Sequence, residues 1–385
     1  MTDVQPLYDL APVARMMLLG VVIALGPMAW IWLRNRQADA VQRLHRLTLI
    51  TLFLTFDLVL FGAFTRLTDS GLGCPDWPGC YGSASPIGAS VSISAAQEAM
   101  PTGPVTFSKA WIEMIHRYLA TAVGVLILVL AISSTMARRR LPVSPWWPWL
   151  TLVWIGLQGA FGALTVTMKL FPAIVTLHLL GGLGLLALLR AQSVAYAHAE
   201  TGAAGPASVT GAQKLAILLV FVLLWIQVAL GGWVSTNYAV LACRDFPACQ
   251  GAWWPVMDLD AGFTLWRELG QAGTGDAITF PALTAIHYMH RLAAYAVLGA
   301  LAWLSWRLWR VPGLRKAARG VALLAAWQLA TGLSNVVLEW PLVAAVSHTA
   351  GAAALVVVLT GLLAGTRTAD RLARRPTNSL MQPSR

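Results

Sequence analysis

Charged residues are scarce in this chain of 385 residues, which has 27 Lys and Arg and only 16 Asp and Glu. The uncharged stretches are too long for the core of a soluble domain, because about 20 apolar residues in a helix already cross the hydrocarbon layer. The composition therefore excludes a soluble globular protein and predicts membrane-spanning helices. Nine such runs occur, at 16–33, 47–66, 110–136, 146–167, 172–195, 214–234, 282–309, 315–337 and 341–364.

Acidic residues are the rarer charged class, and the basic residues gather in four segments. With nine spans these segments all fall on one face of the membrane, which the positive-inside rule makes cytoplasmic. The N-terminus and the long loops 67–109 and 238–281 then lie outside, and the C-terminus lies inside. The net charge of +11 is therefore explained by the membrane topology, and it gives no reason to expect a nucleic-acid partner. The segments contain Arg34, Arg36, Arg43 and Arg46; Arg138, Arg139 and Arg140; Arg310, Arg315, Lys316 and Arg319; and Arg367, Arg371, Arg374 and Arg375.

Cysteine is also rare, and all four cysteines lie in the two outer loops, as Cys74 and Cys80 and as Cys243 and Cys249 with the same spacing. An oxidising exterior allows each pair to form a disulfide. Closing so short a loop gives only about 2 kcal/mol of stabilisation, which is adequate for a structural staple. The alternative is a redox role for the first pair, since small exposed disulfides can be labile. The sequence leaves both interpretations open.

The two halves of the chain repeat the same elements. Glu113-x-x-His116-Arg117 is followed by Gln158, Gly162 and His178, and His287-x-x-His290-Arg291 is followed by Gln328, Gly332 and His348. A repeat of this length defines the architecture before any local motif does.

We therefore expect an all-α integral membrane protein with two pseudo-symmetric four-helix bundles. Residues 47–200 form the first bundle, 201–213 a cytoplasmic linker, 214–366 the second bundle and 367–385 a basic cytoplasmic tail. Residues 1–46 add one further helix and a loop. The run 16–33 has no basic region before it and no cleavage site after it, which favours an anchor over a signal peptide.

Four histidines occupy matching places in the repeat: His116, His178, His290 and His348. Each lies roughly two turns, or about 9–12 Å, from the outer end of a span that runs inward. A lone intramembrane histidine is often only a polar contact between helices, but a repeated pair at one depth indicates a functional site. Zinc would require further ligands at that depth. Haem iron needs only two axial ligands, and helix bundles house haem readily.

Several glycines accompany these histidines on the predicted helices. Small residues in membrane helices usually allow close packing, and the alternative is that they make room for a macrocycle. They are Gly159, Gly162, Gly181, Gly182, Gly231, Gly232, Gly332 and Gly351.

The segments GAFTRLTDSGL at 62–72 and CPDWP at 74–78 resemble the first outer loop of the haem A synthase family. The element around Glu113 and His116 and the later histidines resemble the rest of the family pattern, in order, from about 47 to 364. Two features depart from it: the extra first span, and a cysteine pair in both outer loops, which only some members have.

This resemblance implies an oxidoreductase that converts haem O to haem A. The C8 methyl group of the ring becomes a formyl group through successive hydroxylations that use O2. His116 and His178 would flank the iron of the substrate haem O. His290 and His348 would be the axial ligands of a permanent haem B, which transfers electrons.

Two further residues are candidates for this chemistry. Glu113 lies one turn before His116 on the same helix face, and its repeat counterpart is His287. A carboxyl at that depth can hold or pass a proton, although it could instead only pair with Arg117 or Arg66. Arg66 is the candidate partner of a haem propionate, because a guanidinium binds carboxylates in bidentate fashion; interfacial snorkelling is the alternative. The role of His287 is left open as an extra polar contact of the haem B site.

Two other classes of protein compete with this interpretation. A di-haem b-type electron carrier would need haems near opposite faces, whereas the four histidines share one depth. A transporter built from repeats would be expected to contain broken helices, and these runs are continuous. The resemblance further implies the bacterial inner membrane, with the N-terminus periplasmic and the C-terminus cytoplasmic. It implies lipid and a haem O synthase as partners, and it leaves open the electron donor and a homo-oligomer.

Overall fold

The computed structural model describes residues 11–201 and 207–368. Within these residues, nine helices are long and apolar enough to cross a membrane, which confirms the predicted helical membrane protein. They are α1 (Ala11–Arg34), α2 (Ala40–Leu67), α4 (Phe107–Met136), α5 (Trp146–Thr167), α6 (Pro172–Thr201), α7 (Gly211–Thr236), α9 (Phe280–Trp309), α10 (Arg315–Val337) and α11 (Leu342–Gly365).

Short elements lie between the spans and were not predicted. They are α3 (Ser90–Ala99), a 3-10 turn at Arg138–Arg140, α8 (Leu259–Phe263), and the strands β1 (Ala207–Val209) and β2 (Thr366–Thr368). The two strands pair in parallel. β1 lies in the predicted linker, just before α7, and β2 directly follows α11, so their pairing connects the two ends of the second bundle. The predicted N-terminal residues 1–10 and most of the basic tail, 369–385, lie outside the described residues.

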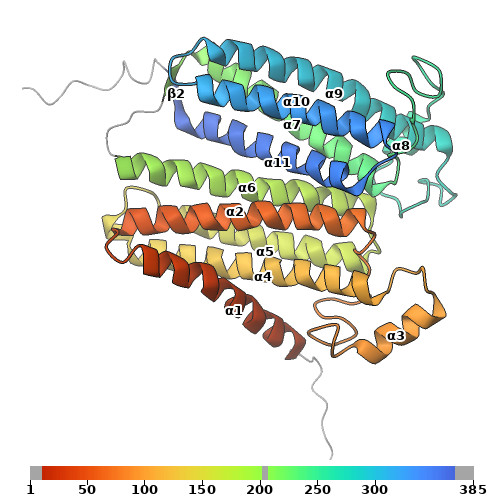
Figure 1. Cartoon of the computed structure of the whole chain (residues 1–385), viewed down its shortest axis with the longest axis horizontal. Helices are drawn as coiled ribbons and strands as arrows, with labels where there is room; N and C mark the ends of the chain where they lie inside the picture. The colour runs from red at the N-terminus through yellow and green to blue at the C-terminus, as the bar shows by residue number, and fades with distance from the viewer. Residues whose placement is uncertain (1–10, 202–206, 369–385) are drawn as a thin grey trace, which may run out of the picture.

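Each half of the chain forms a ring of four helices. In the first ring α2 packs on α4, α4 on α5, α5 on α6 and α6 on α2, so α4 and α6 lie diagonally across the bundle. The second ring repeats this with α7, α9, α10 and α11, which places α9 and α11 on its diagonal. The rings meet through α6, which packs on α7 and α11, and through α2 on α11 (Figure 1). The histidine-bearing helices are the diagonal ones.

Polar caps set the outer starts of one diagonal helix in each bundle. The side chains of Thr106 and Thr279 accept hydrogen bonds from Lys109 N and Ala282 N, at the N-termini of α4 and α9. Such caps satisfy backbone donors that have no partner within the helix. The long loops that carry α3 and α8 lie at one end of the molecule, and β2 lies at the other (Figure 1). This agrees with the predicted placing of both loops on one face.

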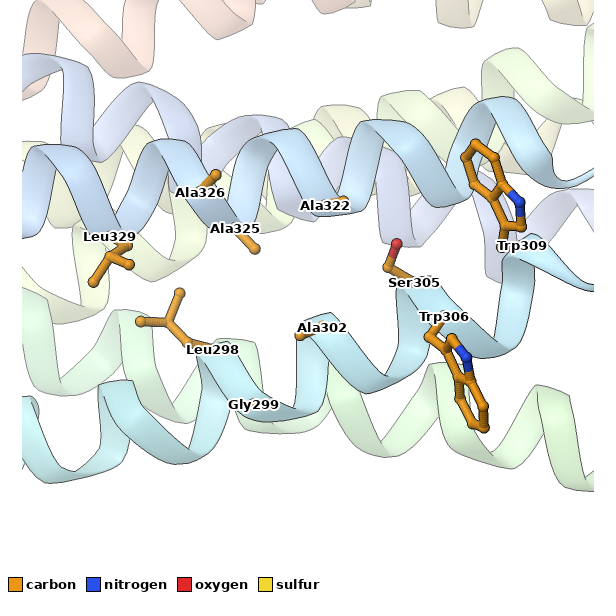
Figure 2. Close-up of a pocket in the computed structure, with 10 residues that line it drawn as sticks. All are labelled: Leu298, Gly299, Ala302, Ser305, Trp306, Trp309, Ala322, Ala325, Ala326 and Leu329. Atoms are coloured by element: carbon orange, nitrogen blue, oxygen red, sulfur yellow. The ribbon is translucent and has the colours of Figure 1, made fainter.

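The extra helix α1 lies along the first bundle only. It packs mainly on α4 and less on α2, and Figure 1 shows it at the edge of the molecule. Gly20 allows the close approach, because a Cβ there would lie 2.5 Å from Cγ2 of Thr121. The second bundle has no equivalent helix among the described residues. An apolar groove of about 660 Å3 lies between α9 and α10 of this bundle, lined by residues such as Ala302, Trp306 and Ala325 (Figure 2). None of the four histidines lines this groove.

Candidate functional site

The four repeated histidines form two pairs, one in each bundle. His116 of α4 and His178 of α6 lie on the diagonal of the first, and His290 of α9 and His348 of α11 on that of the second. Within each pair the imidazoles are close enough to interact electrostatically. All four side chains are half-buried. Each bundle therefore presents two imidazoles from opposite helices, as the sequence predicted.

A glycine on a neighbouring helix lies against each imidazole. A Cβ on Gly62 or Gly162 would lie 3.0 or 3.4 Å from Cε1 of His116 or His178. In the second bundle, a Cβ on Gly231 or Gly332 would lie 2.9 or 3.2 Å from Cε1 of His290 or His348. These glycines lie close to the imidazole rings. A Cβ on Gly62, Gly231 or Gly332 would require its ring to shift, whereas a Cβ on Gly162 would be in ordinary contact with His178.

The other glycines that the sequence singled out do not lie against the imidazoles. Gly182 and Gly232 pack on side chains of other helices, where a Cβ would lie 3.6 Å from Val59 and 3.2 Å from Leu179 and Thr176, respectively. Gly181 and Gly351 face the side chains of Gln158 and Gln328, which would collide with a Cβ there, while Gly159 has nothing within 4 Å. Gln328 Nε2 also donates to the backbone oxygen of His348 at 2.9 Å. Gln328 thus ties α10 to α11 at the level of His348, and Gln158 lies against α6 at the matching place.

The two pairs differ at Nδ1. In the second bundle Gln227 Nε2 lies 3.0 Å from Nδ1 of His290, and Thr331 Oγ1 lies 2.9 Å from Nδ1 of His348. In the first bundle Nδ1 of His116 and of His178 is buried and has no hydrogen-bond partner among the described residues. Phe61 stacks its ring parallel to that of His116, with centroids 6.3 Å apart. Two similar pairs of imidazoles therefore have unlike surroundings.

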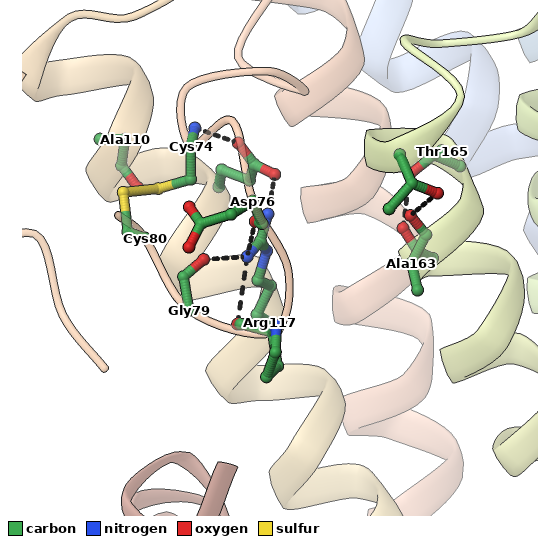
Figure 3. A network of polar contacts seen from close by, with 12 residues as sticks. Cys74, Asp76, Gly79, Cys80, Ala110, Arg117, Ala163 and Thr165 are labelled. Atoms are coloured by element: carbon green, nitrogen blue, oxygen red, sulfur yellow. Dashed lines mark hydrogen bonds and ion pairs between the residues drawn. A yellow bond between two sulfur atoms is a disulfide. The ribbon is translucent and has the colours of Figure 1, made fainter. Parts of the chain in front are cut away.

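Both cysteine pairs are disulfides in the structure, Cys74–Cys80 and Cys243–Cys249. Arg117 donates through Nη1 to the backbone oxygens of Asp76, Pro78 and Gly79, at 3.0, 3.1 and 2.6 Å. Figure 3 shows this guanidinium inside the curve of the loop, beside the disulfide.

Arg291 repeats this arrangement in the second bundle. It donates to the backbone oxygens of Cys243, Asp245 and Ala248 at 3.1, 2.8 and 2.7 Å. Hydrogen bonds from the backbone N–H of Gly251 and Gln250 lower the pKa of the Asp245 carboxyl. Each arginine that follows a histidine in the repeat therefore holds a disulfide loop.

Glu113 is buried and bonded on both sides. Its carboxylate forms an ion pair with Arg117, one turn further along α4, and accepts a hydrogen bond of 2.8 Å from Cys74 N. The pairing with Arg117 is the structural alternative that the sequence offered, and it coexists with the position one turn from His116. The counterpart, His287, is buried, with Nδ1 3.0 Å from the backbone oxygen of Ala239. A carboxylate thus occurs at this place in the first bundle only.

Arg66 lies where the bundles meet. Its Nη2 donates to the backbone oxygen of Ser235 at 2.6 Å, and its Nη1 contacts Asp69 at 3.2 Å. The guanidinium carbon lies 4.1 Å from the centre of the Tyr238 ring, and the Tyr238 hydroxyl donates to Asp69 at 2.6 Å. The partners from α7 and the turn after it could not be foreseen from spacing. The role of Arg66 toward a propionate stays a prediction.

Sequence reasoning missed three polar residues inside the spans. Gln227 and Thr331 contact histidines, and Asp57 is an exposed carboxyl within α2. Each carries a signal that could have been used, because a polar side chain within an apolar run is costly. Thr331 also directly precedes the repeated Gly332. Among the described residues, no three His, Cys, Asp or Glu side chains form a cluster that could hold a metal ion. The candidate iron ligands in each bundle are therefore its two imidazoles.

The comparisons with known proteins agree with this arrangement. The family model described as cytochrome oxidase assembly protein matches residues 45–360. A haem A synthase of Shewanella oneidensis is 38% identical over 313 residues, which cover 80% of this chain and 92% of the relative. A haem A synthase of Paracoccus denitrificans is 28% identical over 346 residues, which cover 82% of this chain and 85% of the relative. The residues that the family model matches include most of both bundles, from α2 to the last turns of α11, and leave α1 outside.

Proposed function

Because the chain belongs to the haem A synthase family of cytochrome oxidase assembly proteins, we propose that it converts haem O to haem A. The C8 methyl group of the ring becomes a formyl group through successive hydroxylations that use O2, with loss of water. The observation that carries this proposal is the double histidine pair, in which each bundle offers two imidazoles from diagonal helices and each imidazole lies against a glycine. Two imidazoles from opposite helices can hold haem iron as its axial ligands.

The second bundle is the proposed haem B half. His290 and His348 would hold the iron, and bound haem B would supply electrons to the reaction. Gln227 Nε2 lies beside the ring of His290 and donates to the backbone oxygen of His290 at 3.1 Å. The residues fit this role because Nδ1 of His348 lies 2.9 Å from Thr331 Oγ1, an atom that can accept the Nδ1 proton. Ligating histidines typically have such a partner for the nitrogen that does not bind the metal.

The first bundle is the proposed substrate half. His116 and His178 would flank haem O. Their Nδ1 atoms form no hydrogen bond with any described residue, so no such bond holds the rings in one orientation. Glu113 would hold or move a proton beside the reacting edge of the ring. The support for this role is its burial one turn from His116 and the replacement of the carboxylate by His287 in the other half. Arg66 would bind a propionate at the junction of the bundles.

The same proposal places the protein in the bacterial inner membrane. The N-terminus and both disulfide loops would face the periplasm, and the C-terminus would face the cytoplasm. A haem O synthase would deliver the substrate, and an electron donor of unidentified class would reduce haem B. The support is the distribution of basic residues over the loops and the common end of the molecule that carries both outer loops.

Pigment extraction from the purified protein tests this function. Membranes that supply haem O should yield a protein containing haem B together with haem O and haem A, and membranes that express the double variant His116→Ala, His178→Ala should yield haem B without haem A. Two equivalent haems B in the wild-type protein would instead indicate an electron carrier, and the lack of any Soret band would indicate a transporter. Either result would overturn the proposal.

A further inference from the structure

The Thr331 hydroxyl has a defined direction in its hydrogen bonds. Its oxygen lies 2.8 Å from the backbone oxygen of Trp327, one turn earlier on α10, and 2.9 Å from Nδ1 of His348. A carbonyl oxygen can only accept, and the hydroxyl has a single proton to donate. The arrangement that satisfies both contacts therefore has the hydroxyl donating to the Trp327 oxygen and accepting from Nδ1 of His348. In this arrangement Nδ1 of His348 carries the proton.

This assignment fixes the chemistry of the other ring nitrogen. A neutral imidazole has one protonated nitrogen and one nitrogen with a free lone pair. With the proton on Nδ1 of His348, the lone pair is on Nε2, and Nε2 is the atom able to bind iron. A hydrogen bond from the other ring nitrogen also fixes the ring's orientation and makes a histidine ligand more basic.

The repeat shows that this contact belongs to one half only. Thr331 directly precedes Gly332, and the residue that directly precedes Gly162 in the first half is Phe161. The Phe161 side chain has no hydrogen-bond acceptor, and Nδ1 of His178 is buried without a hydrogen bond to any described residue. The backbone of Gln158 lies near the His178 ring, as the backbone of Gln328 lies near the His348 ring, so that weaker contact is common to both halves. The helices and the glycines are repeated, but the hydroxyl group is not.

The other histidine pair shows the same contrast. Gln227 lies one turn before Gly231 and places its side-chain amide within 3.0 Å of Nδ1 of His290. The residue one turn before Gly62 is Leu58, and Nδ1 of His116 has no partner among the described residues. Polar contact at Nδ1 therefore separates the two pairs at both positions.

We propose that Thr331 is a positioning residue that holds His348 with Nε2 available to iron, and that this contact distinguishes the resident cofactor site from the substrate site. The inference rests on the proposed function, in which the second bundle binds haem B. A permanent cofactor benefits from ligands whose orientation is fixed before binding. A substrate that must enter and leave is served by imidazoles without such a bond, and the side chains of Phe161 and Leu58 offer none.

The test compares Thr331→Val, which replaces the hydroxyl by a methyl group of similar size, with Thr331→Ser, which restores it. Ser334→Ala is the matched control, because the Ser334 hydroxyl lies one turn further along α10 and bonds only to the backbone oxygen of Ala330. The readouts on purified full-length protein are haem B bound per protein, the reduced-minus-oxidised spectrum, and the midpoint potential of haem B.

Thr331→Val should weaken haem B binding about tenfold, the lower end of the loss seen when the partner of a ligating histidine is removed. It should also raise the midpoint potential, because His348 becomes a weaker electron donor to the iron. Thr331→Ser and Ser334→Ala should behave like the wild type. A wild-type potential and wild-type haem B content in Thr331→Val would overturn the inference, as would a failure of Thr331→Ser to restore them.

The variants His290→Ala and His348→Ala separate this inference from the function on which it rests. If both lose haem B while Thr331→Val is unchanged, the assignment of the cofactor site stands and the role of Thr331 is wrong. If both keep a normal low-spin haem B spectrum, the proposed cofactor site itself is wrong.

Discussion

Glu113 and Arg117 form a buried ion pair across one turn of α4, and His116 lies between them in the sequence. The same Glu113 carboxylate accepts from Cys74 N, and the same Arg117 guanidinium donates to three carbonyl groups of the loop that the disulfide closes. The first outer loop is therefore bonded to the residues on either side of a candidate substrate ligand. A displacement of this loop must move either the ion pair or the helix that carries His116.

Arg117→Ala should make the Cys74–Cys80 disulfide easier to reduce, because the loop loses three hydrogen bonds from a charged donor, each contributing about 1.5–3 kcal/mol. Loss of even one such bond corresponds to at least about a tenfold faster reduction through an opened loop. Arg291→Ala should affect Cys243–Cys249 in the same way. The measurement is the rate of thiol labelling after addition of a membrane-impermeant reductant, resolved for each loop. Equal rates in wild type and variants would show that the arginines do not secure the loops.

Gly231→Ala should reduce haem B binding, because the new methyl group would lie 2.9 Å from Cε1 of His290 and displace the imidazole. Gly62→Ala should leave haem B in place and disturb His116, whose Cε1 would lie 3.0 Å from the new methyl group. Gly159→Ala is the control, because nothing lies within 4 Å of its Cβ position. Soret absorbance per purified protein measures the effect. Loss of haem B in Gly62→Ala but not in Gly231→Ala would reverse the assignment of the halves.

His290→Ala and His348→Ala should each lose haem B or convert its low-spin spectrum, because each removes one of two proposed axial ligands. His45→Ala is a suitable control, since His45 pairs with Glu200 and lies near the start of α2, far along that helix from Gly62. Visible spectra of the three purified variants provide the measurement. A normal low-spin haem B spectrum in both ligand variants would remove the basis of the proposed cofactor half.

Reporter fusions at the two ends of the chain should locate the N-terminus outside the membrane and the C-terminus in the cytoplasm. Nine spans require opposite faces, and the basic loops set the direction. A fusion in the loop between α4 and α5, which contains Arg138, Arg139 and Arg140, is the internal reference for the cytoplasmic face. Termini that report the same face would contradict the count of spans.

The membrane spans and the histidine pairs were predictable because each depends only on distances along the chain. The thickness of the bilayer sets the length of an apolar helix, and equal intervals in a repeat place His178 and His348 at the same position along α6 and α11. The boundaries were less well predicted. α4 begins at Phe107 rather than 110, because the capping residue Thr106 and the polar first turn lie outside the apolar run.

The surroundings of the histidines were not predictable, because they depend on how neighbouring helices are rotated about their axes. The glycines were noticed in the sequence, but which ones face a ring and which face Gln158 or Gln328 is decided by packing. The hydrogen bond from Arg66 to Ser235 joins the two halves of the chain, and residues so far apart in the sequence share no local pattern that would predict their contact. The residues at Nδ1, Gln227 and Thr331, could not be found from the repeat, because the first half has Leu58 and Phe161 at the equivalent positions.

Glu113→Gln should leave the chain folded with haem B bound and should lower the formation of haem A by about 10²–10⁴-fold, the usual contribution of a group that transfers a proton. The amide keeps the shape of the side chain and can still accept from Cys74 N, but it can neither take up a proton nor carry charge. Glu113→Ala should be at least as inactive, and it also leaves Arg117 without its partner.

The ratio of haem A to haem O in membranes that express each variant, normalised to bound haem B, measures the effect on chemistry alone. A purely structural carboxylate behaves differently, because its loss lowers the amount of folded protein, and haem B falls together with haem A while the ratio stays constant. A wild-type ratio in Glu113→Gln would therefore show that Glu113 only anchors the disulfide loop through Arg117 and Cys74. The proton path would then have to begin at another group of the first bundle.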